Sequence, residues 1–118
     1  MKLAIIILNW NGKKLLEQFL PSVIQHSKDA DIYVADNAST DDSVAFITSN
    51  YPTITVIQNK ENAGYAKGYN DALKSVDADV FCLLNSDVEV TQNWLNPIVN
   101  TFKEDTNTAI IQPKLLDY

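Results

Sequence analysis

The sequence predicts an α/β domain in which a mostly parallel β-sheet is flanked by helices. Short apolar runs typical of buried strands alternate along the chain with segments whose apolar residues recur at helical spacing. Strands that alternate with helices of this length favour an open sheet with crossover connections. A chain of 118 residues with 46% hydrophobic content is the size of one ordinary domain. We therefore expect a single domain over residues 1–118.

The first half of the chain supplies two strands, each followed by a helix. Residues 3–8 (LAIIIL) form a continuous aliphatic run, as in a strand that is covered on both faces. A helix is predicted from Lys13, and Pro21 marks either a kink or a new first turn within it. Residues 32–35 (IYVA) predict the second strand. Side-chain caps for the next helix are predicted at Ser39, Thr40 and Asp41.

The second half supplies three further strands and two helices. Strands are predicted at residues 54–57 (ITVI) and 79–84 (DVFCLL), and a helix is predicted between them at residues 64–76. Thr91 is the predicted cap of a fourth helix with one apolar side. Residues 108–111 (TAII) predict a fifth strand.

Charge and composition exclude several classes of protein. Nine lysines, no arginine and fifteen acidic residues give a net charge of -6, which argues against binding to nucleic acid or anionic lipid. Without arginine, a bound polyphosphate must be neutralised by lysine, by backbone amides or by a metal ion. The single cysteine, Cys82, cannot form an internal disulfide. The apolar run at residues 3–8 is too short to span a membrane.

Polar residues follow four of the predicted strands. They are the stretches Asn9 to Asn11, Asp36-Asn37, Asn59 to Gly64, and Asn85 to Asp87. In open parallel sheets the ligand crevice lies at the carboxyl ends of the strands, so these residues are candidates for binding. The same residue types also form turns through hydrogen bonds between side chain and backbone, and that alternative stays open for each stretch.

Each candidate side chain has a functional and a structural interpretation. Asp87 either holds Mg²⁺ or Mn²⁺ beside a diphosphate or caps the following turn, and Glu89 is expected to face water. Asp36 either accepts a hydrogen bond from a base or ribose or forms a turn. Trp10 either stacks on a flat ring or plugs the sheet edge. Lys67 lies near a helix start that suits an anion, or is simply solvated.

Other common motifs are absent from the chain. The stretch GYAKGY does not match the glycine patterns of P-loop or dinucleotide-binding proteins. His26 is the single histidine of the chain, and no cysteine lies near it in the sequence, so we predict neither a zinc site nor a catalytic triad around it. We predict no catalytic residue in this chain.

Four stretches taken together resemble one known family. They are IIILNWNG, YVADNASTDDS, NKENAGYAKGYNDAL and VFCLLNSDVEV, and they occur in the order found in family-two inverting glycosyltransferases of the GT-A fold. The resemblance covers the N-terminal, nucleotide-sugar-binding half of that family and spans residues 3 to about 103. The form N-x-G-[FY]-A-x-G-x-N, which begins at Asn62, is most similar to the rhamnosyltransferase-like branch.

The resemblance implies a Rossmann-like GT-A domain, a site and a cofactor. Leu8 to Trp10 and the pair Asp36-Asn37 would hold the base, and Gly64 to Lys67 would lie near the base and ribose. Asn85 stands where the first Asp of an Asp-x-Asp motif would be, which weakens the expected hold on the metal, and Asp87 would coordinate Mn²⁺ or Mg²⁺. The implied substrate-binding residues are Leu8, Asn9, Trp10, Asp36, Asn37, Gly64, Lys67, Asn85 and Ser86.

The resemblance also implies an activity and its partners. The donor would be a nucleotide-diphosphate sugar, and the acceptor a glycan or lipid-linked molecule bound by a second half. In the family the general base lies in that half, and neither Asp105 nor Asp117 has the context of a base. We therefore expect a fragment that binds donor weakly and transfers little sugar. The family works on cytoplasmic precursors of surface polysaccharide, at the inner membrane face, and a bare sheet edge would allow homo-oligomers.

A receiver-like signalling domain that binds Mg²⁺ is the alternative. It would also be a five-stranded parallel sheet in a chain of this size, and Lys114 follows the fifth predicted strand as that class requires. That class also requires an acidic pair directly after the first strand, where this chain has Asn9 and Trp10. A protein-interaction domain without catalysis would leave the polar strand ends unexplained.

Overall fold

The protein folds around one parallel sheet of four strands, as the computed structural model of residues 1–117 shows. The strand order is β3-β2-β1-β4, and each pair of neighbouring strands is parallel. The predicted α/β class with a parallel sheet is confirmed. The strands are β1 (Leu3–Asn9), β2 (Asp31–Asp36), β3 (Thr55–Gln58) and β4 (Val80–Leu84). The helices are α1 (Lys13–His26), α2 (Ser43–Asn50), α3 (Tyr65–Leu73) and α4 (Leu95–Glu104).

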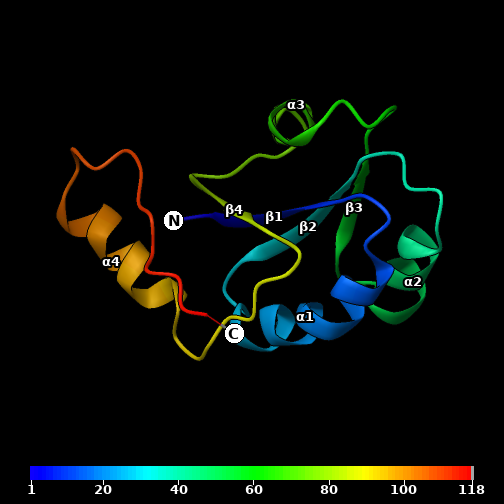
Figure 1. Ribbon diagram of the computed structural model, residues 1–118. Helices are drawn as coiled ribbons and strands as arrows, with labels where there is room; N and C mark the ends of the chain where they lie inside the picture. The colour runs from blue at the N-terminus through cyan, green and yellow to red at the C-terminus, as the bar shows by residue number, and fades with distance from the viewer. Residues whose placement is uncertain (118) are drawn as a thin grey trace.

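Helices cover both faces of the sheet. In Figure 1, α3 lies on one side of the strands, and α1 and α2 lie on the other. Side chains alternate along β1 accordingly, because successive residues of a strand point to opposite faces. Ile5 and Ile7 pack in the cluster that contains Leu16 of α1, whereas Ile6 packs in the cluster that contains Tyr69 of α3. Burial on both faces explains why β1 is a continuous aliphatic run.

Helix α1 is continuous across its proline. Pro21 lies inside the helix and is exposed to solvent. It therefore marks neither a new helix nor a break, although it cannot donate a main-chain hydrogen bond to the turn before it. Four apolar residues of α1 are buried at helical spacing, and they attach the helix to the sheet. They are Leu16, Phe19, Leu20 and Val23.

Because the strands are parallel, their carboxyl ends all lie on one edge of the sheet. From β1 the sheet extends to β2 and β3 on one side and to β4 on the other, so the order of connections reverses beside β1. Such a reversal opens a crevice at the carboxyl ends of the strands. The register brings Asn9 of β1 opposite Asp36 of β2, and Asp36 opposite Gln58 of β3. Three polar side chains therefore end three adjacent strands in one row.

Two expectations for the connections were wrong, and a third is confirmed in part. Residues 108–111 do not form a strand, and Ile110 is 88% exposed. An apolar run forms a strand only beside main-chain partners, and β4 pairs with β1 alone within residues 1–117. Thr91 does not cap α4, which begins at Leu95 without a side-chain cap. At α2 the N-cap is Asp42, while Asp41 Oδ1 accepts the main-chain N–H of the first helical residue.

Helix α4 is joined less closely to the rest of the fold. It extends away from the other helices in Figure 1, and Leu95 is its buried residue.

No helix among residues 1–117 has the length and apolarity needed to cross a membrane.

Candidate functional site

β2 ends at Asp36, whose buried carboxylate is surrounded by hydrogen-bond donors. Asp36 is 1% exposed. Its Oδ1 accepts from Asn9 Nδ2 at 3.0 Å and from Ser39 Oγ at 2.6 Å. Its Oδ2 accepts from the Ser39 main-chain N–H at 2.9 Å and from Gln58 Nε2 at 3.0 Å. A carboxylate has about four acceptor positions, so the capacity of Asp36 is filled by the protein itself.

Hydrogen bonding keeps this buried group ionised. Burial alone would raise the pKa of Asp36, but the hydrogen bonds from Ser39, Gln58 and Asn9 together outweigh it and lower the pKa below 3.8. Asn9 is also 1% exposed, and its Oδ1 has no hydrogen-bond partner within residues 1–117. A Cβ at position 12 would lie 2.5 Å from that oxygen, so only glycine fits there. Asn9, Asp36 and Gly12 thus form a tightly packed structural unit.

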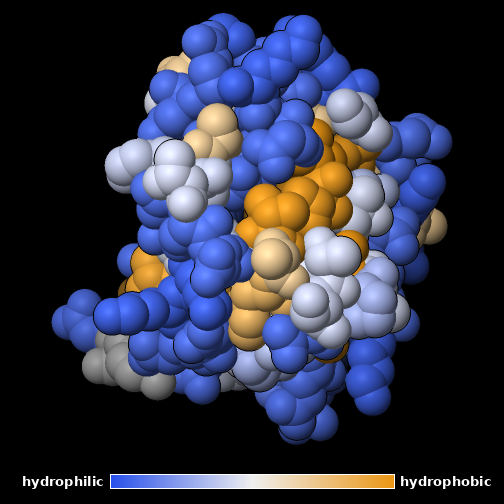
Figure 2. All heavy atoms as spheres, turned by 90° about the vertical axis from the view of Figure 1, so that its right-hand side faces the viewer, coloured by the Kyte–Doolittle hydropathy of each residue, from blue (hydrophilic) through white to orange (hydrophobic). Residues whose placement is uncertain are grey.

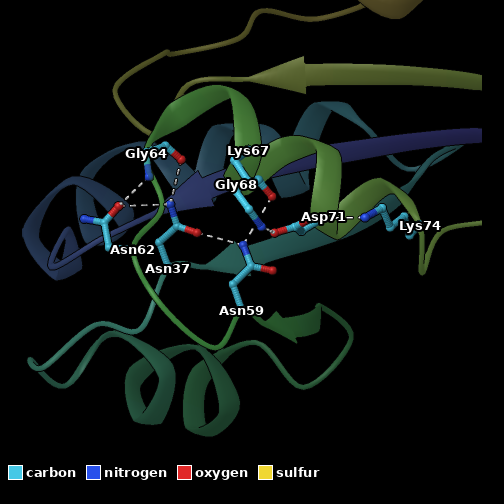
Figure 3. Close-up of polar contacts among 8 residues, drawn as sticks. All are labelled: Asn37, Asn59, Asn62, Gly64, Lys67, Gly68, Asp71 and Lys74. Atoms are coloured by element: carbon cyan, nitrogen blue, oxygen red, sulfur yellow. Dashed lines mark hydrogen bonds and ion pairs between the residues drawn. The ribbon is translucent and has the colours of Figure 1, made fainter.

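A second network of asparagines holds the start of α3, as Figure 3 shows. Asn37 is 2% exposed and donates from Nδ2 to Gly64 O at 3.2 Å and to Asn62 Oδ1 at 3.4 Å. Asn59 donates from Nδ2 to Asn37 Oδ1 at 2.7 Å and to Gly68 O at 3.2 Å. The side-chain amides of Asn37 and Asn59 therefore tie the loop after β3 and the first turns of α3 to the end of β2.

Gly64 and Gly68 are each required as glycine, for different reasons. Gly64 has φ of 91°, in the region that favours glycine, and it is the N-cap of α3. Gly68 lies against the Asn37 side chain and Leu8. A Cβ there would lie 2.7 Å from Asn37 Nδ2 and 2.9 Å from Leu8 Cδ1. Gly64 therefore allows the backbone turn into α3, and Gly68 allows α3 to pack closely on the strand ends.

Trp10 lies in the open after β1. Its side chain is 55% exposed, so it does not plug the sheet edge. Asn11 beside it has φ of 50°, and its Oδ1 accepts from the main-chain N–H of Thr40 at 2.7 Å and of Asp41 at 3.2 Å. The turn that carries Trp10 is thereby fixed to the loop after β2. An exposed indole on a fixed turn is available for stacking against a planar ring.

The end of β4 differs from the other strand ends because its polar side chains remain accessible. Asn85, Asp87 and Glu89 are exposed, and Ser86 is half-buried. The Asp87 side chain makes no hydrogen bond or ion pair with residues 1–117. Glu89 faces solvent as predicted. The carboxylate oxygens of Asp87 are therefore free to meet a cation, and the cap alternative for Asp87 has no hydrogen bond to support it.

Two tyrosines of α3 hold this end of β4. Tyr69 donates its hydroxyl to Leu84 O at 3.0 Å, and Tyr65 donates its hydroxyl to Asn85 Oδ1 at 3.0 Å. Burial raises the pKa of Tyr69, so it remains a neutral donor. Tyr69 had no predicted role, and Tyr65 was predicted only as part of the stretch Gly64 to Lys67, at the aromatic position of the motif that begins at Asn62.

Lys67 is exposed and paired within α3. Its Nζ lies 2.5 Å from Asp71 Oδ2, and Lys74 Nζ lies 3.3 Å from Asp71 Oδ1. The hydrogen bond that Lys67 donates to Asp71 raises the pKa of Lys67, so the ammonium is fully protonated at neutral pH. Figure 3 shows Lys67, Asp71 and Lys74 along one side of α3. An incoming anion would have to compete with Asp71 for this lysine.

The surface on the side of the strand ends combines apolar and polar parts. Figure 2 views the molecule from the side on which the strands of Figure 1 end, and it shows an apolar area enclosed by polar residues. A cavity of about 400 Å³ opens beside the start of α1, between Asn11 to Leu15 and the acidic pair Asp41-Asp42. Another, of about 430 Å³, lies beside the end of α1 and the turn before α4, away from the strand ends.

The structure thus separates the predicted site residues into exposed, buried and half-buried ones. Trp10, Gly64, Lys67, Asn85 and Asp87 are exposed. Asn9, Asp36 and Asn37 are buried, and they bond mainly to other residues of the protein. Leu8 and Ser86 are half-buried. Sequence reasoning assigned no site role to Gln58 or Tyr69, because nothing in the residue pattern shows which side chains meet across adjacent strands.

Known proteins resemble this chain in sequence and in fold. YfnE of Bacillus subtilis, an uncharacterized glycosyltransferase, is 29% identical over 115 residues, which are 93% of this chain and 29% of that protein. Staphylococcus aureus TarS 1–349, solved with UDP-GlcNAc, has a TM-score of 0.77 at 20% identity, over 95% of this chain and 37% of that one. The mannosyltransferase PcManGT of Pyrobaculum calidifontis, solved with GDP-Man and Mn²⁺, has a TM-score of 0.66 at 22% identity, over 75% of this chain and 28% of that one.

The matched proteins are longer than this chain, which spans about a third of their length or less. The structural neighbours are GT-A glycosyltransferases, and nothing in the comparisons supports a receiver-like domain. The profile of the family described as glycosyl transferase family 2 matches residues 4–115. Because that match covers nearly the whole sequence, the chain belongs to glycosyl transferase family 2.

Proposed function

We propose that residues 1–118 are one domain that binds the nucleotide-diphosphate sugar donor, together with Mn²⁺ or Mg²⁺, for inverting glycosyl transfer. The observation that carries this proposal is the exposed carboxylate of Asp87, which has no partner within residues 1–117, at the carboxyl end of β4 and beside the point where the sheet order reverses. Family membership and the nucleotide-sugar complexes of TarS and PcManGT support it.

The residues at this end fit a cation that is shared with the donor. No group of three His, Cys, Asp or Glu side chains among residues 1–117 is arranged to hold a metal ion, so the protein would supply Asp87 and the donor would supply phosphate oxygens. Mg²⁺ is commonly held in this way, by one or two carboxylates with phosphate oxygens and water. The bound ion would neutralise the diphosphate and assist its departure as a leaving group.

The exposed residues would contact the donor and the buried ones would shape its pocket. Trp10 would stack on the base, Asn85 and Ser86 would lie along the ribose and phosphates, and Gly64 and Lys67 would border them. Leu8, Asn9, Asp36 and Asn37 were expected to hold the base. Because their side chains are largely enclosed and mostly bonded within the protein, we propose that they act by fixing the loops around the base.

The finer features of the activity rest on the sequence resemblance. The motif that begins at Asn62 favours the rhamnosyltransferase-like branch. The resemblance to the family as a whole favours a glycan or lipid-linked acceptor and a role in cytoplasmic polysaccharide biosynthesis, at the inner membrane face. Asp105 is exposed at the C-cap of α4 and contacts only its own turn, so it gains no features of a general base. Residues 1–118 alone should therefore bind donor and transfer little sugar.

Titration calorimetry with UDP, dTDP and GDP, each with and without Mn²⁺, tests the proposal. We expect one nucleotide to bind in a manner that Mn²⁺ strengthens, and Asp87→Ala to remove the metal effect. A control variant, Glu89→Ala, removes a neighbouring exposed carboxylate and should keep it. Absence of binding by all three nucleotides would overturn the assignment, and binding that is indifferent to Mn²⁺ would remove the metal role of Asp87.

A further inference from the structure

We propose that Tyr65 is a positioning residue that fixes the amide of Asn85, so that Asn85 meets the donor as a hydrogen-bond donor and not as a metal ligand. The inference rests on the proposed function, since it assigns a role within the same site. Its central observation is the hydrogen bond from the Tyr65 hydroxyl to Asn85 Oδ1 at 3.0 Å.

The two ends of an asparagine amide have different chemistry. The oxygen can accept hydrogen bonds or bind a cation, whereas the nitrogen carries two N–H donors and cannot bind a cation. The Tyr65 hydroxyl donates to one of the two acceptor positions of Asn85 Oδ1 and so restrains the direction in which the amide faces, while Asn85 Nδ2 has no partner within residues 1–117. Asn85 is exposed. It therefore presents N–H groups, which suit a ribose hydroxyl or a phosphate oxygen.

Tyr65 is itself held in place from two directions. Its ring packs edge-on against Tyr69, with centroids 5.0 Å apart and an interplanar angle of 74°. Tyr69 is 2% exposed and donates its hydroxyl to Leu84 O, one residue before Asn85. At its other side, Tyr65 follows Gly64, whose carbonyl accepts a hydrogen bond from Asn37. The ring of Tyr65 is thus preorganised before a ligand arrives.

Asn85 and Asp87 would therefore have different roles in binding the donor and the metal ion. Asp87 offers two free oxygens to a cation, and Asn85 offers two N–H groups to the oxygens of the donor. An aspartate at position 85 would accept the same hydrogen bond from Tyr65 with one oxygen and offer the other to the metal. The residue at position 85 therefore determines how many protein oxygens the ion receives.

The test compares Tyr65→Phe, which removes only the hydroxyl, with Tyr51→Phe as a matched control. Tyr51 packs edge-on against Phe46 beside α2, and its hydroxyl has no hydrogen-bond partner within residues 1–117. For each variant, calorimetry measures the affinity for the nucleoside diphosphate that the wild type binds, at saturating Mn²⁺. Electron paramagnetic resonance of free Mn²⁺ measures the metal affinity at saturating nucleotide.

We expect Tyr65→Phe to weaken nucleotide affinity about three- to tenfold, the worth of one hydrogen bond, and to leave Mn²⁺ affinity undiminished. Tyr51→Phe should change neither. Asn85→Asp should weaken nucleotide affinity and strengthen Mn²⁺ affinity, because an amide donor is exchanged for an oxygen ligand. Thermal unfolding of each variant checks that the fold is intact.

Two outcomes would overturn the inference while the proposed function stands. One is wild-type nucleotide affinity in Tyr65→Phe. The other is a fall in Mn²⁺ affinity in Tyr65→Phe as large as the fall in nucleotide affinity, which would place Asn85 among the metal ligands. If the wild-type protein binds no nucleotide with or without Mn²⁺, the proposed function itself fails, and the role of Tyr65 fails with it.

Discussion

The polar residues that end β1, β2 and β3 differ from those that end β4, although the two sets look alike in sequence. Asp36 is 1% exposed and accepts four hydrogen bonds from the protein. Asp87 is exposed and has no partner within residues 1–117. A carboxylate with four internal donors is part of the scaffold, whereas one without any is available to a ligand. The comparison shows that polarity at a strand end does not by itself identify a binding residue.

Sheet position accounts for the difference. β2 has neighbours on both sides, and the register aligns Asn9, Asp36 and Gln58 in one row where each finds a partner. β4 is an edge strand that pairs with β1 alone within residues 1–117. Fewer protein groups surround its end, so Asn85 and Asp87 stay accessible. The ends of β1, β2 and β3 bond to one another and build the rim of the crevice, although β3 is also an edge strand, whereas the end of β4 stays accessible.

The largest effect should come from removing the buried carboxylate. Asp36→Ala leaves the donors of Asn9, Ser39 and Gln58 without their acceptor, and we expect a loss of about 3 kcal/mol or more in the free energy of unfolding. Urea denaturation measures it. Asp29→Ala, at an exposed residue, should stay within about 0.5 kcal/mol of wild type. A loss below about 1 kcal/mol in Asp36→Ala would show that Asp36 is not a scaffold residue.

A smaller loss is expected where α3 meets the strand ends. In Gly68→Ala the new Cβ lies 2.7 Å from Asn37 Nδ2 and 2.9 Å from Leu8 Cδ1. Overpacking of about 1 to 3 kcal/mol should exceed the gain of about 1 kcal/mol that alanine brings to a helix. When Asn37 is already replaced by alanine, Gly68→Ala should lower the free energy of unfolding less, because the side-chain amide of Asn37 no longer lies against the new Cβ. Equal costs in both backgrounds, measured as a double-mutant cycle, would contradict this contact.

Acid should remove part of the contribution of Asp36. The folded state holds the pKa of Asp36 below 3.8, so it binds fewer protons than the unfolded state near that pH. The contribution is therefore complete above 3.8 and is lost as the pH falls through the lower pKa of the folded state. The difference in unfolding free energy between wild type and Asp36→Asn should be constant well above pH 3.8 and should shrink as the pH falls below that value. A pH-independent difference would contradict the shift.

Sequence reasoning predicted the sheet more successfully than its connections. The apolar runs of β1 and β4 and the alternation with helices were sufficient to predict the parallel fold. Burial on both faces explains the run in β1, whereas Phe81 and Leu83 of β4 are exposed. Residues 108–111 were predicted as a strand from the same kind of pattern, yet a strand also needs a neighbour that the pattern does not specify. Thr91 matched the composition of a cap without the geometry of one.

The sequence was sufficient to predict where the candidate site lies. It was not sufficient to predict which of its residues bind a ligand and which hold the fold. The rule that ligands bind at strand ends led to Trp10, Asp36 and Asp87 alike. Only burial and hydrogen-bond partners separate Asp36 from Asp87, and these depend on which loops meet across the sheet. The hydrogen bond between Tyr65 and Asn85 joins residues 20 positions apart, and nothing in either local pattern indicates it.

The most direct test measures stability and Mn²⁺-dependent nucleotide binding together in Asp87→Ala and Asp36→Ala. We predict that Asp87→Ala changes the free energy of unfolding by less than about 0.5 kcal/mol, as expected for an exposed side chain without partners, and removes the effect of Mn²⁺ on nucleotide affinity. Asp36→Ala should destabilise the fold. If Asp87→Ala retained Mn²⁺-dependent binding at wild-type strength, the metal site would lie elsewhere and the account of β4 would be wrong.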